Sequence, residues 1–273
     1  MRHVRVATAL LNVGGLRFNT ADPFILASRK ICPVYVDVRM LTSSPEGWKA
    51  AVEGLVEAVR GLGNVNAVSG GELADLLFSV PVAFELGMPH VAVRKQPKGY
   101  GTGGRLIGEV SQGSRFAHVS DLITSGMSAL QWIDAIREAG GVVGDYLVVF
   151  DRNQGGKEAL DRKGVRVHSL LELDDEFVAF ASGRGGLTGA QVEEVRKYLA
   201  DPEQWSVGFL RRNPRFLTKR IAAAGGLMTR SEGLEVLTQG YPELIAEVGA
   251  KVRRRLREIG VKEDLLALNH KPL

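Results

Sequence analysis

The sequence predicts an α/β fold built around a parallel β-sheet and followed by an α-helical C-terminal region. Short apolar runs alternate with helical patterns as far as residue 175, which is typical of parallel strands joined by crossover helices. Beyond the glycine-rich segment 183–186, runs of this strand type cease. The length of 273 residues suits one full domain with a smaller appendage. We therefore expect domains at 1–182 and 183–273.

The individual elements follow from apolar spacing and from the residues that begin and end helices. The expected strands are the apolar runs at 32–39, 67–68, 91–93, 116–121, 142–150 and 165–170. The expected helices between them are 45–59, 73–86 and 128–138, the first opened by Ser44 and Pro45 and the last ended by Gly140. Five glycines within 99–108 predict a mobile loop.

The C-terminal region carries the basic excess of the chain. The net charge is +4, from 35 Lys and Arg against 31 Asp and Glu. From Phe177 onward there are 16 basic and 11 acidic residues, which leaves 19 basic and 20 acidic residues in the part before Phe177. The segment 242–259 has one apolar face, and Arg253, Arg254, Arg255 and Arg257 crowd the rest of it. We expect the apolar face to pack and the arginines to be solvated, so nucleic-acid binding is the weaker interpretation.

Composition excludes several classes of protein. No apolar run approaches the roughly 20 residues needed to cross a bilayer, and the first residues do not resemble a signal peptide. Cys32 is the single cysteine, so neither an internal disulfide nor a thiolate metal site is expected. The five histidines are scattered singly. We expect a cytoplasmic protein.

The segment 116–128 is the most informative one. A strand delivers Asp121 at its carboxyl end, and a turn containing Thr124, Ser125 and Gly126 then opens a helix near Ser128. Backbone N–H groups, hydroxyls and the helix dipole at such a turn form a cradle for an anion. In open α/β sheets ligands bind at this edge. An ordinary capped turn is the alternative that this segment alone leaves open.

This segment resembles the phosphoribosyl-pyrophosphate (PRPP) signature of type I phosphoribosyltransferases. Four further segments resemble those of the orotate phosphoribosyltransferases, in the family's order: 24–39, 67–72, 93–101 and 150–171. The resemblance covers about residues 15–175. It implies a type I phosphoribosyltransferase fold, which is a doubly wound parallel sheet with a small N-terminal hood. It also implies transfer of phosphoribose from PRPP to orotate in pyrimidine biosynthesis, by a homodimer whose mobile loop reaches the neighbouring active site.

The resemblance assigns roles to individual residues. Lys95, Lys98 and Asp121 are the expected catalytic residues. The expected PRPP-binding residues are Arg94, Lys95, Lys98, Tyr100, Asp121, Thr124, Ser125, Gly126, Met127 and Ser128. Orotate is expected at Arg152 and Thr124, because a guanidinium can grip a carboxylate with two hydrogen bonds. The loop beside pyrophosphate is Gly70, Gly71 and Glu72. Mg²⁺ is the expected cofactor, held mainly by PRPP and water rather than directly by the protein.

Two positions depart from the family pattern. The family usually has a second acid before Asp121, where this chain has Ser120, and commonly a lysine near Ala27. On that basis Ser120→Asp is expected to strengthen PRPP binding. Two alternative functions remain open: a phosphoribosyltransferase for another base, and a non-catalytic PRPP sensor that binds nucleic acid. Ser120, Ala27 and the basic tail favour the sensor, whereas Arg94, Lys95 and Lys98 favour the enzyme.

Overall fold

The computed structural model describes residues 3–98, 104–224 and 231–261, which divide into two compact units. Unit 1 comprises Met1–Leu16 and Val36–Ala181, and unit 2 comprises Arg17–Tyr35 and Ser182–Leu273. Unit 2 thus combines a segment near the N-terminus with the C-terminal helices.

Unit 1 is organised around a six-stranded sheet with the order β10-β9-β8-β5-β6-β7. Its strands are β5 (Ala67–Gly71), β6 (His90–Lys98), β7 (Gly104–Ile107), β8 (Arg115–Ile123), β9 (Val142–Asp151) and β10 (Arg166–Glu172). All neighbouring pairs are parallel except β6 and β7. The expected doubly wound sheet is therefore confirmed, with one antiparallel edge strand added.

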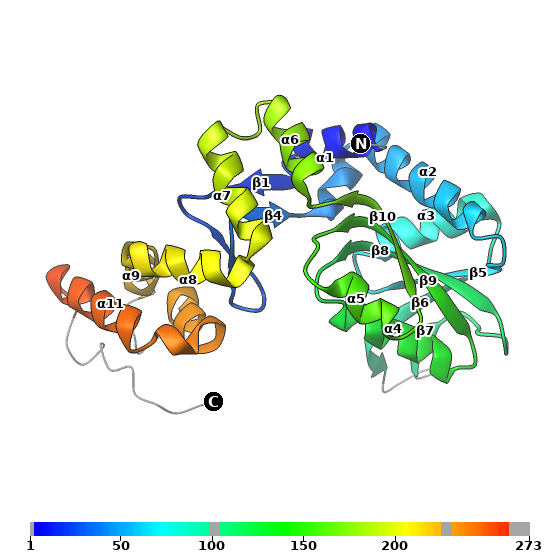
Figure 1. Ribbon diagram of the computed structural model, residues 1–273. Coiled ribbons are helices and arrows are strands. Elements are labelled where there is room, and N and C mark those ends of the chain that lie inside the picture. The colour runs from blue at the N-terminus through cyan, green and yellow to red at the C-terminus, as the bar shows by residue number, and fades with distance from the viewer. Residues whose placement is uncertain (1–2, 99–103, 225–230, 262–273) are drawn as a thin grey trace. The chain divides into compact units, whose positions relative to one another are not determined.

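Helices cover both faces of this sheet (Figure 1). The helix α2 (Pro45–Gly61) and the helix α3 (Leu76–Leu86) pack on one face, while α4 (Met127–Glu138) and α5 (Gly156–Asp161) pack on the other. As expected, α2 begins at Pro45, and the Ser44 hydroxyl caps it by accepting from the Gly47 amide at 3.2 Å. Unit 1 also contains α1 (Val4–Asn12), the 3-10 helix η1 (Val38–Ser43) and most of α6 (Asp175–Gly183).

Two expectations about local structure were wrong. The expected strand 32–39 is divided into β3 (Ile31–Cys32) and β4 (Val34–Val36), because Pro33 has no N–H to continue a ladder. Part of the expected glycine loop is a strand, since β7 pairs with β6 from Leu106 and Val93 to Gly104 and Lys98. Here cross-strand pairing overrides the weak strand propensity of glycine.

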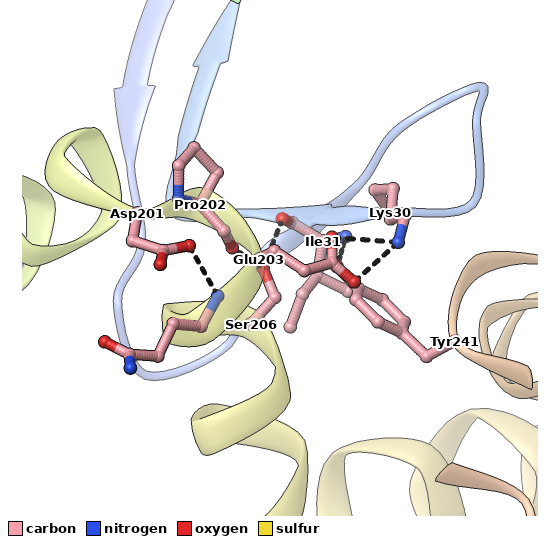
Figure 2. Close-up of polar contacts among 8 residues, drawn as sticks. Lys30, Ile31, Asp201, Pro202, Glu203, Ser206 and Tyr241 are labelled. Carbon is pink, nitrogen blue, oxygen red and sulfur yellow. Dashed lines mark hydrogen bonds and ion pairs between the residues drawn. The ribbon is translucent and has the colours of Figure 1, made fainter. Parts of the chain in front are cut away.

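Unit 2 joins four short strands to the C-terminal helices. The strand β1 (Leu16–Phe18), whose first residue belongs to unit 1, pairs with β4, and β2 (Phe24–Ile25) pairs antiparallel with β3. Figure 2 shows how β3 is held by Ser206 and Tyr241 from the C-terminal part of the chain. The Ile31 amide donates to the Tyr241 hydroxyl at 3.0 Å, and the Ser206 hydroxyl donates to the Ile31 carbonyl at 3.3 Å. Lys30 forms an ion pair with Glu203 at 2.8 Å.

The helices of unit 2 follow one another closely, and aromatic contacts join the first of them. They are α7 (Gly189–Ala200), α8 (Pro202–Arg212), α9 (Pro214–Ala223), α10 (Glu232–Glu235), the π-helix η2 (Val236–Gly240), the 3-10 helix η3 (Pro242–Leu244) and α11 (Glu247–Glu258). Trp205 lies 5.5 Å from Tyr198 and 5.4 Å from Phe209 between ring centroids. Trp205 therefore anchors these helices, as expected.

The basic helix α11 packs as the apolar pattern predicts. Val248, Val252 and Leu256 are buried, and α11 contacts α8 and α9. Arg254 and Arg257 are exposed as expected, but Arg253 and Arg255 are half-buried and the Nε atom of Arg255 is buried, so the expectation of four solvated arginines was wrong for these two. Ile259, at the end of the expected apolar face, is exposed. Across residues 3–98, 104–224 and 231–261, no helix is both long and apolar enough to span a membrane.

Candidate active site

The sheet of unit 1 has one point where its strand order reverses, between β5 and β8. From β5 the chain proceeds outward to β6 on one side, and it later resumes at β8 on the other side. The carboxyl ends of the two strands diverge there and leave a crevice, which is the usual ligand site of open α/β sheets. A cavity of about 510 Å³ lies at this point.

The cavity gathers most of the expected site residues. Those lining it are Glu72, Lys95, Asp121, Thr124, Ser125, Gly126, Met127 and Ser128. They come from the ends of β5, β6 and β8 and from the start of α4. Segments that are far apart in the sequence and resemble one family therefore meet at one site.

The start of α4 is shaped to receive an anion. Gly126 is the N-cap residue with φ of 78°, a left-handed conformation that glycine adopts without strain. A side chain at this position would also collide with Leu160 of α5. No described side chain caps α4, so the amides of its first turn stay available to a ligand at the positive end of the helix dipole.

On the opposite wall, Glu72 fixes the end of β5 against β6. The Glu72 amide donates to the Val93 carbonyl at 2.8 Å, and the Lys95 amide donates to the Glu72 carboxylate at 2.7 Å. These contacts hold the backbone beneath the Lys95 side chain, which is exposed and lines the cavity. Gly71 lies so close to the Trp132 indole that a β-carbon would collide with it.

A carboxylate that the sequence analysis did not single out lies at the base of the cavity. Asp75 is only 6% exposed. Its Oδ1 accepts from the Ser120 hydroxyl at 2.7 Å and from the Asp121 amide at 3.4 Å, and its Oδ2 accepts from the Gly71 amide at 2.9 Å. Burial and the adjacent Asp75 carboxylate raise the pKa of Asp121 to about 7, and Arg39 opposes this in part.

Beneath Asp75 lies a chain of buried polar groups. His118 is fully buried, and its Nε2 lies 3.5 Å from Asp75 Oδ2 while its Nδ1 is 3.0 Å from the Ser69 hydroxyl. The His118 ring stacks on Tyr146 with centroids 5.2 Å apart. Burial and the Asp75 carboxylate raise the pKa of Tyr146 well above its ordinary value. His118 is thus packed, as expected, but it packs against the site.

Other expected residues lie away from the lining or outside the described part of the chain. Arg94 and the glycines 70 and 71 do not line the cavity. Arg152 is 5% exposed at the end of β9 and is also absent from the lining, although its amide donates to the Ile123 carbonyl at 3.1 Å. Tyr100 lies outside the described residues, and so does the side chain of Lys98.

Sequence reasoning missed several residues of the lining. Asp75, Trp132 and Tyr146 belong to it and had been given no role in the site. Asp75 stands in no recognisable motif, and only its distance of three residues from Glu72 could have drawn attention to it. In the described part of the chain, no group of three or more His, Cys, Asp and Glu side chains could hold a metal ion.

Comparison with known proteins identifies the family. No family model matches the chain. An orotate phosphoribosyltransferase of a Ruegeria species is 36% identical over 204 residues, which cover 73% of this chain and 90% of that protein. The orotate phosphoribosyltransferase of Methanopyrus kandleri is 38% identical over 175 residues, covering 64% of this chain and 92% of the relative.

Solved structures agree with this assignment. The crystal structure of orotate phosphoribosyltransferase from Aeropyrum pernix superimposes with a TM-score of 0.55 at 29% identity, covering 66% of this chain and 99% of that chain. The fold is also shared with a Leishmania donovani UMP synthase, at a TM-score of 0.65 and 24% identity over 73% of this chain and 42% of that chain. Two long sequence matches and a matching fold lead to one conclusion: the chain belongs to the orotate phosphoribosyltransferase family.

Proposed function

We propose that the chain transfers the phosphoribosyl group of PRPP to orotate, giving orotidine 5′-phosphate and pyrophosphate in pyrimidine biosynthesis. The observation that carries this proposal is the cavity at the β5/β8 reversal. It combines the uncapped start of α4, the Asp121 carboxylate and the Lys95 ammonium in one site. These groups match the three parts of PRPP: a phosphomonoester, a ribose and a pyrophosphate.

The start of α4 would bind the 5′-phosphate. Amides of the turn 124–128 and the hydroxyls of Thr124, Ser125 and Ser128 supply hydrogen-bond donors, and the helix dipole adds partial positive charge. Ser125 and Ser128 are exposed in the ligand-free chain, so a phosphate can reach them. This contact fixes one end of the substrate and leaves its C1′ atom toward the strand ends.

Lys95 would act on the leaving group. In the reaction the C1′–O bond to pyrophosphate breaks, and its electron pair leaves with the pyrophosphate oxygen. The orotate N1 atom then supplies the pair for the new C1′–N bond, and the N1 proton passes to pyrophosphate or water. Lys95, together with Lys98, neutralises the charge that develops on pyrophosphate, which is commonly the largest contribution to such catalysis.

Asp121 would hold the sugar. Its carboxylate is placed to accept hydrogen bonds from ribose hydroxyls, and its negative charge favours the positive charge that develops at C1′. The ionised form is required for this role. Because the pKa of Asp121 is raised to about 7, we expect the activity to increase as the pH rises through that value.

Arg152 and Thr124 would bind orotate. The backbone of Arg152 is tied to Ile123, directly before the turn that contains Thr124. A base on this side of the ribose would therefore come near both residues. Arg152 is buried and makes contacts within the chain, so its guanidinium would have to turn toward the cavity before it could give a planar pair of donors to the orotate carboxylate.

Mg²⁺ is part of the proposed reaction. Oxygens of PRPP and water would hold it, which fits a site with few carboxylates and a hard cation that retains water ligands. When bound, it would supply positive charge that stabilises the departing pyrophosphate.

The proposal includes a cytoplasmic homodimer. Cys32 is a buried thiol, which agrees with a reducing compartment. Val80 and Phe84 of α3 are 47% and 83% exposed. Large exposed apolar side chains of this kind favour a subunit interface.

The mass of the protein in solution tests the dimer. Light scattering after size exclusion should give twice the chain mass, and Phe84→Asp should shift the mass toward that of the monomer. A monomeric wild type would refute the dimer.

A panel of bases tests the choice of substrate. Pyrophosphate release from PRPP should require Mg²⁺ and orotate, and kcat/KM with orotate should exceed that with uracil, adenine or guanine by at least roughly 100-fold. A 100-fold preference is within reach of a single ion pair between Arg152 and the orotate carboxylate, because a base without a carboxylate cannot form this pair. Preference for another base would refute the assignment of orotate while leaving phosphoribosyl transfer in place.

A further inference from the structure

The reversal point of the sheet leaves a gap in backbone pairing. The register of β5 and β8 ends at Ser69 and His118, although β5 continues to Gly71 and β8 to Ile123. The two segments beyond the last pair are those assigned above to pyrophosphate and to ribose. Each segment stays paired with its outer neighbour, β6 or β9, but no backbone pair joins the two segments to each other.

The Asp75 carboxylate bridges this gap. One of its oxygens accepts from the Gly71 amide on the β5 side, and the other accepts from the Ser120 hydroxyl and the Asp121 amide on the β8 side. Ser120 is 2% exposed, and its hydroxyl is engaged by the Asp75 carboxylate at 2.7 Å. Three donors from two strands thus converge on one buried anion.

We propose that Asp75 is a positioning residue, which clamps the pyrophosphate loop to the ribose-binding acid and supplies the second negative charge beside Asp121. This inference rests on the proposed function. The family usually has a second acid directly before Asp121 in sequence. In this chain the second carboxylate near Asp121 is that of Asp75, in the segment before α3. Ser120, at the position of the family's acid, donates a hydrogen bond to the Asp75 carboxylate.

The surroundings of the carboxylate pair are consistent with this role. The titratable groups that face it are His118 of β8, Tyr146 of β9, Arg39 of η1, and Glu72 and Lys95 at the cavity wall. Of the described cations, Arg39 contributes to the charge balance at Asp121, but it is itself paired with Asp37 at 2.7 Å. Asp75 and burial therefore dominate the environment of Asp121.

The test is Asp75→Asn, which keeps the shape of the side chain and removes its charge. The KM for PRPP should rise about 10- to 100-fold, because buried donors lose a charged acceptor, whereas the KM for orotate should change less than about twofold. The midpoint of the pH profile of kcat/KM should also fall by at least about one unit, since Asp121 would lose its like-charged neighbour.

Asp145→Asn is the matched control. Asp145 is another buried aspartate, 5% exposed, and it pairs with His168 at 2.8 Å away from the cavity. This variant should leave both the KM for PRPP and the pH midpoint unchanged. If Asp75→Asn and Asp145→Asn behave alike in both measurements, the clamp is refuted.

A double variant tests the charge independently of the first substitution. Asp75→Asn/Ser120→Asp moves the carboxylate across the hydrogen bond that now joins these residues, so the pH midpoint should return to within about half a unit of wild type. If Asp75→Asn does not fold, the double variant carries the test. A folded double variant with a low midpoint would overturn the proposal.

Failure of the clamp is distinguishable from failure of the proposed function. Pyrophosphate release by the wild type reports on the function. If the wild type does not react, calorimetry with Mg²⁺ and PRPP still measures whether Asp75→Asn weakens PRPP binding about 10- to 100-fold. Equal affinities of Asp75→Asn and Asp145→Asn would refute the clamp in that case also.

Discussion

The substitution Ser120→Asp separates the sequence-based view of the site from the structural one. The family pattern suggests that an acid at position 120 strengthens PRPP binding. In the structure, however, the Ser120 hydroxyl is buried and donates to the Asp75 carboxylate at 2.7 Å. An ionised carboxylate introduced at this position would therefore face a second carboxylate, and we expect the variant to lose stability rather than gain affinity.

The magnitude follows from the separation of the two charges. Two carboxylates about 3.5 Å apart repel by about 5 kcal/mol at an effective dielectric constant of about 20. The new carboxyl would avoid this by retaining its proton, so its pKa in the folded chain would lie far above the unfolded value of about 3.9.

The sign of the pH dependence is then fixed. A group whose pKa is raised on folding destabilises the folded chain increasingly as the pH rises from the unfolded pKa to the folded one. The free energy of unfolding should fall below that of wild type by about 1.5 kcal/mol at pH 5 and by about 5 kcal/mol at pH 8. Below about pH 4 the new carboxyl is protonated in both the folded and the unfolded chain, so this loss of stability disappears.

Denaturant unfolding at pH 5 and pH 8, followed by tryptophan fluorescence, measures the effect. Ser111→Asp, at an exposed serine of unit 1, is the control and should change the free energy of unfolding by less than about 0.5 kcal/mol at either pH. A Ser120→Asp variant as stable as wild type at pH 8, or one that binds PRPP more tightly, would refute the contact between Ser120 and Asp75.

Three further predictions concern the remaining parts of the site and unit 2. Lys95→Ala should lower kcat by roughly 10²- to 10³-fold with a smaller effect on PRPP affinity. The control Lys49→Ala, at an exposed lysine, should change neither kcat nor KM. Arg152→Ala should raise the KM for orotate and leave the KM for PRPP nearly constant. An equal rise in both KM values would indicate a structural role for Arg152. Truncation after residue 182 should lower the melting temperature by several degrees, because β3 loses its bonds to Ser206 and Tyr241, and an unchanged melting curve would contradict this.

Much of the fold was predictable because its signals are local. The Ser44 cap of α2, the alternation of strands and helices, and the turn after Asp121 each lie within a few residues of sequence. The same locality explains why Asp121 and the turn 124–128, predicted from one short segment, line the cavity together. These segments adopt the structure that their own residues favour, and tertiary contacts reinforce it.

What escaped prediction depends on contacts between distant residues. Asp75 contacts Ser120, 45 positions away, through a hydrogen bond that no periodicity encodes. The strand β7 exists because β6 offers it a partner. Ile31 and Tyr241 are 210 positions apart, and their hydrogen bond unites the N-terminal strands with the C-terminal helices in unit 2.

Phosphoribosyl transfer from PRPP to orotate is the reaction that we propose for this chain. Phosphorus NMR of a mixture of the chain, Mg²⁺, PRPP and orotate follows the loss of PRPP and the appearance of pyrophosphate and a phosphomonoester together. We predict equal amounts of the two products, formed only when orotate is present and abolished by Asp121→Asn. Persistence of PRPP in the complete mixture, or its cleavage at the same rate without orotate, would contradict the proposed function.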